Sequence, residues 1–412
     1  MEDECCGLSS SVFRLLSRNM DRFYETLRLK EATMTPYIPA PDPLTPAWLT
    51  AVLRASGALT QGEVLTVTSK PTGAFNSQSS HLQLHYSNAA APGLTTNMIL
   101  KRNIPEPWGV EAGAEEVKFY RLVAALPHAP PAIVPCYAAA YDPASGNSYL
   151  LLQDLSATHA HPVSRDQLIS ITDAVPPANL IERVTDTLAQ HHAYWWDHAL
   201  LDGETFHIGY WSRNAERFAL YLQRRRISWD SLVAGEAAWF PGDLRELYAR
   251  VLDHLEQHWR RYLEPRFQAK ANLTLVHGDA YFSNFMCPTD PAAGATYLLD
   301  WQEPTVDIGG YDLANLCATF WTSEQRHAAQ REQHILQRYH ATLQAHGVSD
   351  YAWRDLLTDY QTGLIYWLLV PVQDRYDGSS KDYWWPKMQC LVTAFREWHC
   401  ADLLGIAADA AG

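Results

Sequence analysis

The hydrophobic pattern of the chain changes its period near residue 152. Before this point, "SHLQLHYS" alternates Leu82, Leu84 and Tyr86 with polar residues, as a half-buried strand does. After it, apolar residues in the segment 244–262 recur at steps of three and four, as in a helix with one buried face. A chain of 412 residues is long enough for two unequal lobes. We therefore expect an α+β protein with a small β-rich N-lobe and a larger helical C-lobe.

The expected boundaries follow from local composition. Met34 opens a proline-rich segment, "MTPYIPAPDPLTPAWL", that reads as the beginning of a domain, and translation could begin there. We expect residues 1–33 to be an N-terminal extension that could be disordered, residues 34–152 to form the N-lobe, and residues 153–412 to form the C-lobe.

Charge and cysteine content exclude several classes of protein. The net charge of −14 would repel a phosphate polymer, so we expect no nucleic-acid partner. The seven cysteines show no C-x-x-C motif and no ligand spacing with histidine, so the sequence indicates neither a zinc site nor a disulfide framework. We therefore expect the protein in the reducing cytoplasm. No apolar run is long enough to span a membrane, and the acidic N-terminus does not resemble a secretory signal. The oligomeric state is not indicated.

In the stretch "LVHGDAYFSNF", residues 275–285, several polar residues lie between apolar residues at either end. The flanks are typical of short buried strands, so the polar residues are expected on a loop, where catalytic groups often lie. Asp279 could accept a proton, and Asn284, five residues later, could offer its carbonyl oxygen to a hard cation.

Two further features complete a candidate site. In "YLLDWQE", Asp300 ends a short apolar run; together with Asp279 and Asn284 it gives an oxygen-rich set that suits Mg²⁺ better than zinc. In the N-lobe, Lys101 ends the strand "NMILK", and a helix carrying Glu115 and Glu116 follows. A lysine fixed by a helix glutamate can still bind phosphate oxygens.

The order of these residues resembles the protein-kinase-like fold. The pattern comprises Lys101, Glu116, Gln153-Asp154, His277-Gly278-Asp279 with Asn284, and Asp300-Trp301. Gly278 stands where protein kinases have arginine, which is similar to the small-molecule branch of aminoglycoside phosphotransferases, choline kinases and ecdysteroid-kinase-like proteins. The segment "VDIGGYDLAN" is similar to the D-x-x-x-x-D-L-A segment of that branch. The resemblance covers about residues 35–400.

The resemblance implies an ATP- and Mg²⁺-dependent phosphotransferase that moves the γ-phosphoryl group to a hydroxyl of a small molecule. It implies Asp279 as the catalytic base and Asn284 and Asp300 as ligands of Mg²⁺. The implied nucleotide-binding residues are Lys101 with Glu116, or Glu115 if the helix phase differs, and a hinge for adenine at Leu152 to Leu155, which includes Gln153 and Asp154.

Two positions depart from the protein-kinase pattern. The expected phosphate-covering segment, "KPTGAFNSQSSH", has a single glycine and no G-x-G-x-x-G, so Ser77, Ser79 and Ser80 are expected to donate hydrogen bonds instead. The sequence Asp300-Trp301-Gln302 has no glycine that would permit a large backbone flip, so we expect no activation-loop switch.

The acceptor site is expected in the segment "YWLLVPVQDRYDGSSKDYWW". Aromatic rings with nearby carboxylates attract cations, which favours an amine-bearing or flat amphipathic alcohol. The competing interpretation is that these aromatic residues build a helical core. The candidate acceptor residues are Trp367, Asp374, Tyr376 and Trp384.

The sequence leaves two alternatives open. One is a protein kinase, which Gly278 and the absence of an A-P-E-like segment after Asp300 disfavour. The other is a catalytically silent nucleotide-binding module, which the presence of Lys101, Asp279, Asn284 and Asp300 disfavours.

His277 is expected to bond the backbone near Asp300, and Asp312 is expected to brace the loop that carries Asp279. His191 and His192 are expected in a helix core.

Overall fold

The structure is a computed structural model that describes residues 37–73, 77–202, 210–290, 292 and 294–406. The expected extension 1–33 and part of the expected phosphate-covering segment, 74–76, lie outside the described residues. The chain divides into two compact units. The first comprises 1–129 with 135–154, and the second comprises 130–134 with 155–412. The segment 130–134 joins the second unit because the Leu298 N–H donates to the Ala132 carbonyl at 2.8 Å.

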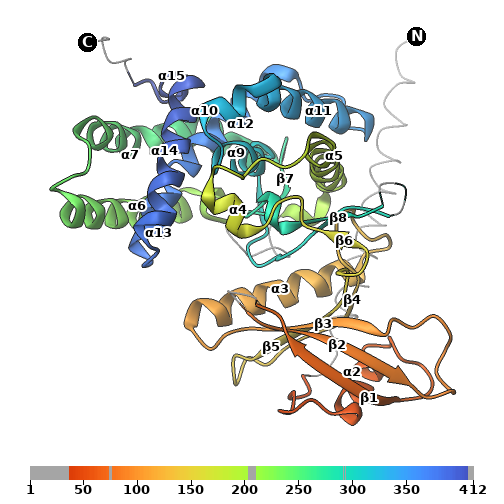
Figure 1. Cartoon of the computed structure of the whole chain (residues 1–412). Helices are drawn as coiled ribbons and strands as arrows, with labels where there is room; N and C mark the ends of the chain where they lie inside the picture. Colours follow the sequence, from red (N-terminus) through yellow and green to blue (C-terminus); the bar gives the residue numbers. More distant parts are fainter. Residues whose placement is uncertain (1–36, 74–76, 203–209, 291, 293, 407–412) are drawn as a thin grey trace, which may run out of the picture. The chain divides into compact units, whose positions relative to one another are not determined.

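The first unit is built on a five-stranded antiparallel sheet with the order β1-β2-β3-β5-β4 (Figure 1). The strands are β1 (Val64–Pro71), β2 (Gln78–Tyr86), β3 (Asn97–Arg102), β4 (Cys136–Tyr141) and β5 (Ser148–Gln153). The strands predicted around Leu82 and Lys101 are β2 and β3, and their pairing sets Lys101 opposite Ser79.

Helices cover both faces of this sheet. Helix α2 (Pro46–Ala55), capped by the Thr45 hydroxyl, packs its buried residues against the face that carries Leu82 and Leu100. Helix α3 (Pro107–Ala125) lies along the opposite face (Figure 1). Because successive side chains of a strand point to opposite faces, burying Leu100 under α2 directs Lys101 toward α3.

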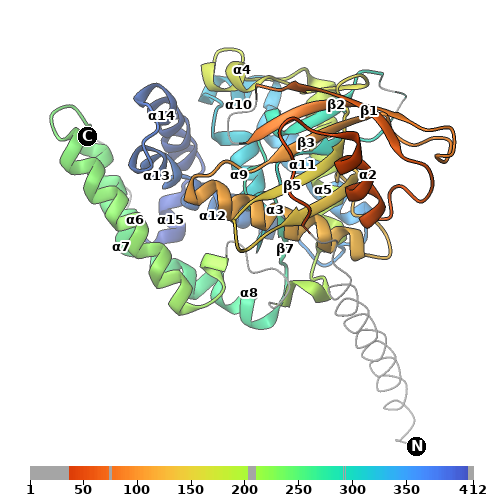
Figure 2. The same cartoon turned by 90° about the horizontal axis from the view of Figure 1, so that it is seen from below.

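The second unit is mainly helical, as Figures 1 and 2 show. Its α-helices are α4 (Arg165–Ser170), α5 (Ala178–Trp195), α6 (Ala215–Glu236), α7 (Gly242–Tyr262), α8 (Glu264–Ala269), α9 (Gly310–Ala318), α10 (Ser323–His327), α11 (Arg331–Ala345), α12 (Trp353–Trp367), α13 (Val370–Tyr376), α14 (Lys381–Glu397) and α15 (Cys400–Leu404). Four 3-10 helices accompany them among the described residues: η1 (Ala199–Asp202), η2 (Tyr210–Ser212), η3 (Phe282–Asn284) and η4 (Ala328–Gln330).

Short strands carry the loops of interest in this unit. They are β6 (His159–Ala160), β7 (Thr274–Val276), β8 (Phe285–Pro288), β9 (Tyr297–Leu298) and β10 (Thr305–Asp307). Strand β7 pairs with β10, and β8 lies between β6 and β9. The stretch 275–285 therefore runs from one small sheet into another, as its apolar flanks predicted.

Helices α9 and α12 touch through their backbones. A Cβ atom at Gly310 would collide with the Asp359 carbonyl, and one at Gly363 would collide with the Gly310 carbonyl. The "GG" of "VDIGGYDLAN" thus includes a residue that must be glycine for α9 to lie against α12.

The predicted fold class is confirmed, and most predicted elements are present. The helix predicted to carry Glu115 and Glu116 is α3, and it begins at Pro107, because proline is well tolerated in the first turn, where its missing N–H is not needed. His191 and His192 are fully buried in α5, as expected. No helix within the described ranges is both long and apolar enough to cross a membrane.

Candidate active site

The loop after β7 requires a glycine at position 278. Gly278 has φ +84°, in the left-handed region that side chains other than glycine's adopt reluctantly. A Cβ atom there would also lie 2.5 Å from the Glu303 carbonyl oxygen. An arginine at this position, as in protein kinases, would not fit this loop.

Asp312, in the first turn of α9, holds the start of this loop. Its Oδ2 accepts the backbone N–H of His277 at 2.7 Å, and its Oδ1 accepts that of Gly278 at 3.0 Å. His192 Nε2 lies 3.1 Å from Oδ2, and His192 Nδ1 lies 2.7 Å from the Tyr339 hydroxyl. Burial raises the pKa of Asp312, but the contacts with His192 and with the loop outweigh it and hold the pKa below its ordinary value. The expected bracing role is confirmed.

His277 ties the loop to the segment that leads to Asp300. Its Nε2 lies 2.8 Å from the Leu299 carbonyl oxygen, and its Nδ1 accepts the Asp279 N–H at 3.2 Å. Burial lowers its pKa, so the ring is neutral with the proton on Nε2. Both ring nitrogens serve the backbone, which confirms the structural role expected for this histidine.

Asn284 and Asp279 face each other across the loop. The Asn284 amide donates to the Asp279 carbonyl at 2.8 Å, with Asp279 Oδ2 at 3.4 Å, so the Asn284 amide oxygen is not used in this contact. The Leu299 N–H donates to the Asn284 carbonyl at 2.8 Å, which places Asp300 next to this pair. Asp300 has φ +68°, a conformation that costs about 1–3 kcal/mol for a residue other than glycine and is often found at functional sites.

The negative charge of this loop is concentrated. Burial, Glu303 and Asp300 raise the pKa of Asp279 well above its ordinary value, and Lys387 opposes them. Carboxylates gathered in this way favour the approach of a cation. No group of three or more His, Cys, Asp or Glu side chains in the described part of the chain forms a ready metal site. A cation bound by Asn284 and Asp300 would therefore need further oxygen ligands, which is usual for Mg²⁺ held with nucleotide phosphates.

In the first unit, Lys101 and Glu116 form an ion pair. Lys101 Nζ lies 2.7 Å from Glu116 Oε2 and 2.8 Å from Oε1, and the Glu116 side chain is 5% exposed. Glu115 instead contacts Lys118 at 3.3 Å. The structure thus selects Glu116 over the neighbouring alternative.

The residues expected to bind phosphate and adenine make hydrogen bonds with other residues of the first unit. Ser77 Oγ lies 2.8 Å from Ser79 Oγ. The backbone N–H of Gln153 donates to Pro135, and that of Asp154 donates to Asn97. The Asp154 carboxylate lies 2.7 Å from His81 Nδ1. Adenine could therefore bind this segment only through other backbone groups, such as those of Leu155.

The four candidate acceptor residues divide into two groups. Trp367 and Asp374 both contact Lys387, whose Nζ lies 5.5 Å from the Trp367 ring and 2.9 Å from Asp374 Oδ2. Trp384 is buried and lies near Trp239, with ring centroids 6.0 Å apart. Tyr376 is 49% exposed. Of these four, only Trp367 and Asp374 are brought to a common group.

Sequence reasoning missed Lys387 and Glu303. Lys387 lies on the buried face of α14, close to Trp384, Met388 and Leu391 in the helical repeat. A lysine inside an apolar helical stripe was the signal that could have found it. Glu303 stands three residues after Asp300 without a motif of its own.

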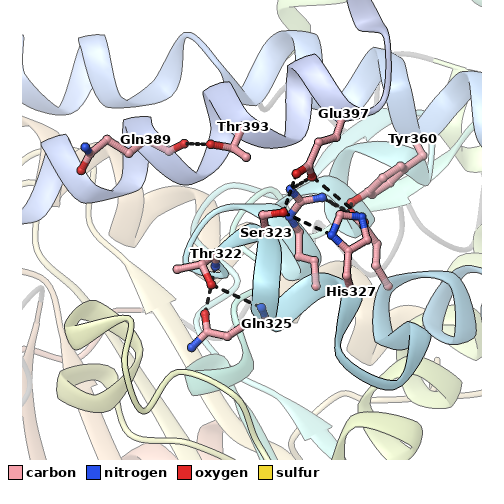
Figure 3. Close-up of polar contacts among 10 residues, drawn as sticks. Thr322, Ser323, Gln325, His327, Tyr360, Gln389, Thr393 and Glu397 are labelled. Carbon is pink, nitrogen blue, oxygen red and sulfur yellow. Dashed lines mark hydrogen bonds and ion pairs between the residues drawn. The ribbon is translucent and has the colours of Figure 1, made fainter.

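A second polar cluster anchors α10 to α14 (Figure 3). Ser323 contacts Glu397 and lies 3.2 Å from His327 Nδ1, a combination of residue types that also occurs in hydrolases. Here, however, the carboxylate binds the serine directly, and His327 Nε2 is 4.0 Å from Glu397, too long for a hydrogen bond. The histidine is therefore not oriented as a base, and the cluster serves packing.

The fold and the loop arrangement are those of a small-molecule kinase of the protein-kinase-like class. The chain belongs to the ecdysteroid kinase-like family, whose sequence model matches residues 118–348, more than half of its length. This confirms the resemblance found in the motifs. Members of this class transfer phosphate to hydroxyl groups, so the chain is an enzyme with an alcohol group as acceptor.

Solved structures with a similar fold share little sequence with this chain. An ethanolamine kinase from Plasmodium vivax has a TM-score of 0.50 at 12% identity, covering 92% of this chain and 96% of that one. A choline kinase from Cryptosporidium parvum has a TM-score of 0.49 at 10% identity, covering 82% and 91%. A choline kinase from Streptococcus pneumoniae has a TM-score of 0.45 at 16% identity, covering 81% and 94%. The comparison with curated proteins found no match.

Proposed function

We propose that the enzyme uses ATP and Mg²⁺ to phosphorylate a hydroxyl of a small molecule. The observation that carries this proposal is the fixed arrangement of Asp279 and Asn284 beside Asp300, on a loop held by Asp312. Such a loop keeps a proton acceptor and oxygen ligands in one place, as in-line phosphoryl transfer requires.

Each residue has a role in this proposal. Asp279 orients the acceptor hydroxyl and accepts its proton. Asn284 and Asp300 would hold Mg²⁺, which in this chemistry neutralises charge on the phosphates. Lys101, fixed by Glu116, binds phosphate oxygens of the nucleotide. No phosphoenzyme is required, because the base and the phosphate-binding groups suffice for direct transfer.

Three further assignments complete the proposal. Ser77 and Ser79 are proposed as phosphate donors because their hydroxyls already lie together in β2 and the turn before it. Leu155 is proposed to offer its backbone to adenine, since the N–H groups of Gln153 and Asp154 are occupied. The cytoplasm remains the proposed compartment because every cysteine among the described residues is unpaired.

The test is ATP consumption in the presence of Mg²⁺ and a panel of small alcohols. We expect at least one alcohol to stimulate ADP formation in the wild-type chain and in Asp253→Asn, a control at a carboxylate that is 64% exposed. Asp279→Asn should abolish the stimulation. Nucleotide binding without any alcohol-dependent turnover across the panel would favour the silent module instead.

A further inference from the structure

Lys387 is a buried cation inside a cage of aromatic rings. The residue is 1% exposed, and its Nζ lies 2.9 Å from Asp374 Oδ2 and 3.0 Å from the Tyr281 hydroxyl. Four ring centroids surround Nζ at 5.3–5.8 Å: those of Tyr281, Phe320, Trp367 and Tyr383. Aromatic faces with a carboxylate are the chemistry that recognises free ammonium groups.

Separate segments of the second unit build this cage. Tyr281 belongs to the candidate catalytic loop, Phe320 follows α9, and Trp367 ends α12. Asp374 lies in α13, and Tyr383 shares α14 with Lys387. An ammonium group therefore organises a site assembled from five places in the sequence.

The lysine carries its charge in this position. Burial lowers the pKa of Lys387, but Asp374 and Tyr383 outweigh it and raise the pKa above its ordinary value. The positive charge also acts on the candidate base, since Lys387 lowers the pKa of Asp279 against the neighbouring carboxylates. Tyr281, which contacts the lysine, is two residues from Asp279. The cage and the candidate base are thus parts of one neighbourhood.

We propose that Lys387 determines acceptor specificity: its tethered ammonium group fills a cation-binding cage beside the catalytic loop and thereby excludes positively charged alcohols. The inference rests on the proposed function, and it identifies the accepted class as alcohols without a cationic group near the reacting hydroxyl. Trp367 and Asp374, which the sequence indicates as ligands for an amine-bearing acceptor, thus hold an internal amine instead.

The experiment removes the internal cation and offers an external one. In Lys387→Ala, choline should bind and raise the melting temperature, with a Kd about tenfold or more below that for the wild-type chain, as desolvated cation–π contacts allow. The neutral carbon isostere of choline, in which a tert-butyl group replaces the trimethylammonium group, should show no such gain. Lys387→Met, which keeps the cage filled without a charge, should not gain choline binding either.

The remaining outcomes are also decisive. Equal gains for choline and its neutral isostere would show a plain cavity and overturn the proposal. A wild-type chain that binds choline as tightly as the alanine variant would overturn it too. If Lys387→Ala is unfolded alone, choline should restore its folded signal, and a variant that choline does not restore contradicts the proposal. Because binding and folding are measured, an absence of kinase activity would leave this result unaffected.

Discussion

The carboxylate of Asp312 is hydrogen-bonded to the backbone N–H of His277 at 2.7 Å, although the two residues lie 35 positions apart in the sequence. The shape of the candidate catalytic loop therefore depends on the first turn of α9. The Gly278 N–H donates a second hydrogen bond to the same carboxylate, so the contact is bidentate and fixes the loop in orientation as well as in position.

Replacing Asp312 by Asn should weaken both stability and turnover. The amide would turn one acceptor oxygen into a donor facing a backbone N–H or His192, which costs about 1–3 kcal/mol for a buried mismatch. We expect the free energy of unfolding in urea to fall by that amount and kcat to fall about tenfold or more as the loop loses its orientation. Asp382→Asn, an exposed position on α14, is the control. Unchanged stability and kcat would refute the bracing role.

Asp279→Asn should separate turnover from nucleotide binding. General-base contributions are about 10²- to 10⁴-fold, so kcat should fall within that range. The Kd for Mg-ATP, measured by calorimetry, should change little because the side chain is not assigned to hold the nucleotide. A parallel loss of nucleotide affinity would instead place Asp279 among the metal ligands.

The adjacent residues Glu115 and Glu116 provide a matched pair for the nucleotide site. Glu116→Gln should remove the negative charge from the Lys101–Glu116 pair and raise the Kd for nucleotide about tenfold, the effect of one charge-assisted contact. Glu115→Gln changes only the contact with Lys118 and should leave the Kd unchanged. Equal effects of both substitutions would show that Lys101 does not depend on Glu116.

Asp307 should make the stability of the fold depend on pH. Burial raises its pKa from the ordinary 3.8 to about 7, although the Ile308 N–H and the Ser212 hydroxyl bind its carboxylate. Between these values the folded state holds a proton that the unfolded state releases. The free energy of unfolding should therefore fall as the pH rises through this window, by an amount on the order of a few kcal/mol.

Asp307→Asn should flatten this dependence. The amide cannot ionise, and the Ser212 hydroxyl can rotate to accept its N–H. Urea denaturation at several pH values between 3.8 and about 7, the two pKa values that bound the window, measures the slope. A slope equal to that of the wild-type chain would assign the pH dependence to another group.

Local patterns predicted the elements, and tertiary contacts decided the site. Alternation placed β2 and β3 correctly because each strand has one face in a core, and the same alternation directed Lys101 away from that core. The choice between Glu115 and Glu116 depends on which face of α3 packs in the interior, and this is a tertiary contact that a local pattern does not settle. The full cage around Lys387 could not be predicted, because Tyr281 and Phe320 join it from distant parts of the sequence.

The backbone contact between α9 and α12 has a mechanical consequence. Helices separated by large side chains can slide past each other by changing rotamers, whereas at Gly310 and Gly363 main chain rests on main chain and leaves no side chain to rearrange. The two helices should therefore move as one rigid body, which includes Asp312 in the first turn of α9. The helix pair that holds the catalytic loop is therefore rigid. Adaptation to different acceptor alcohols should come from side chains around the loop and not from a displacement of the loop itself.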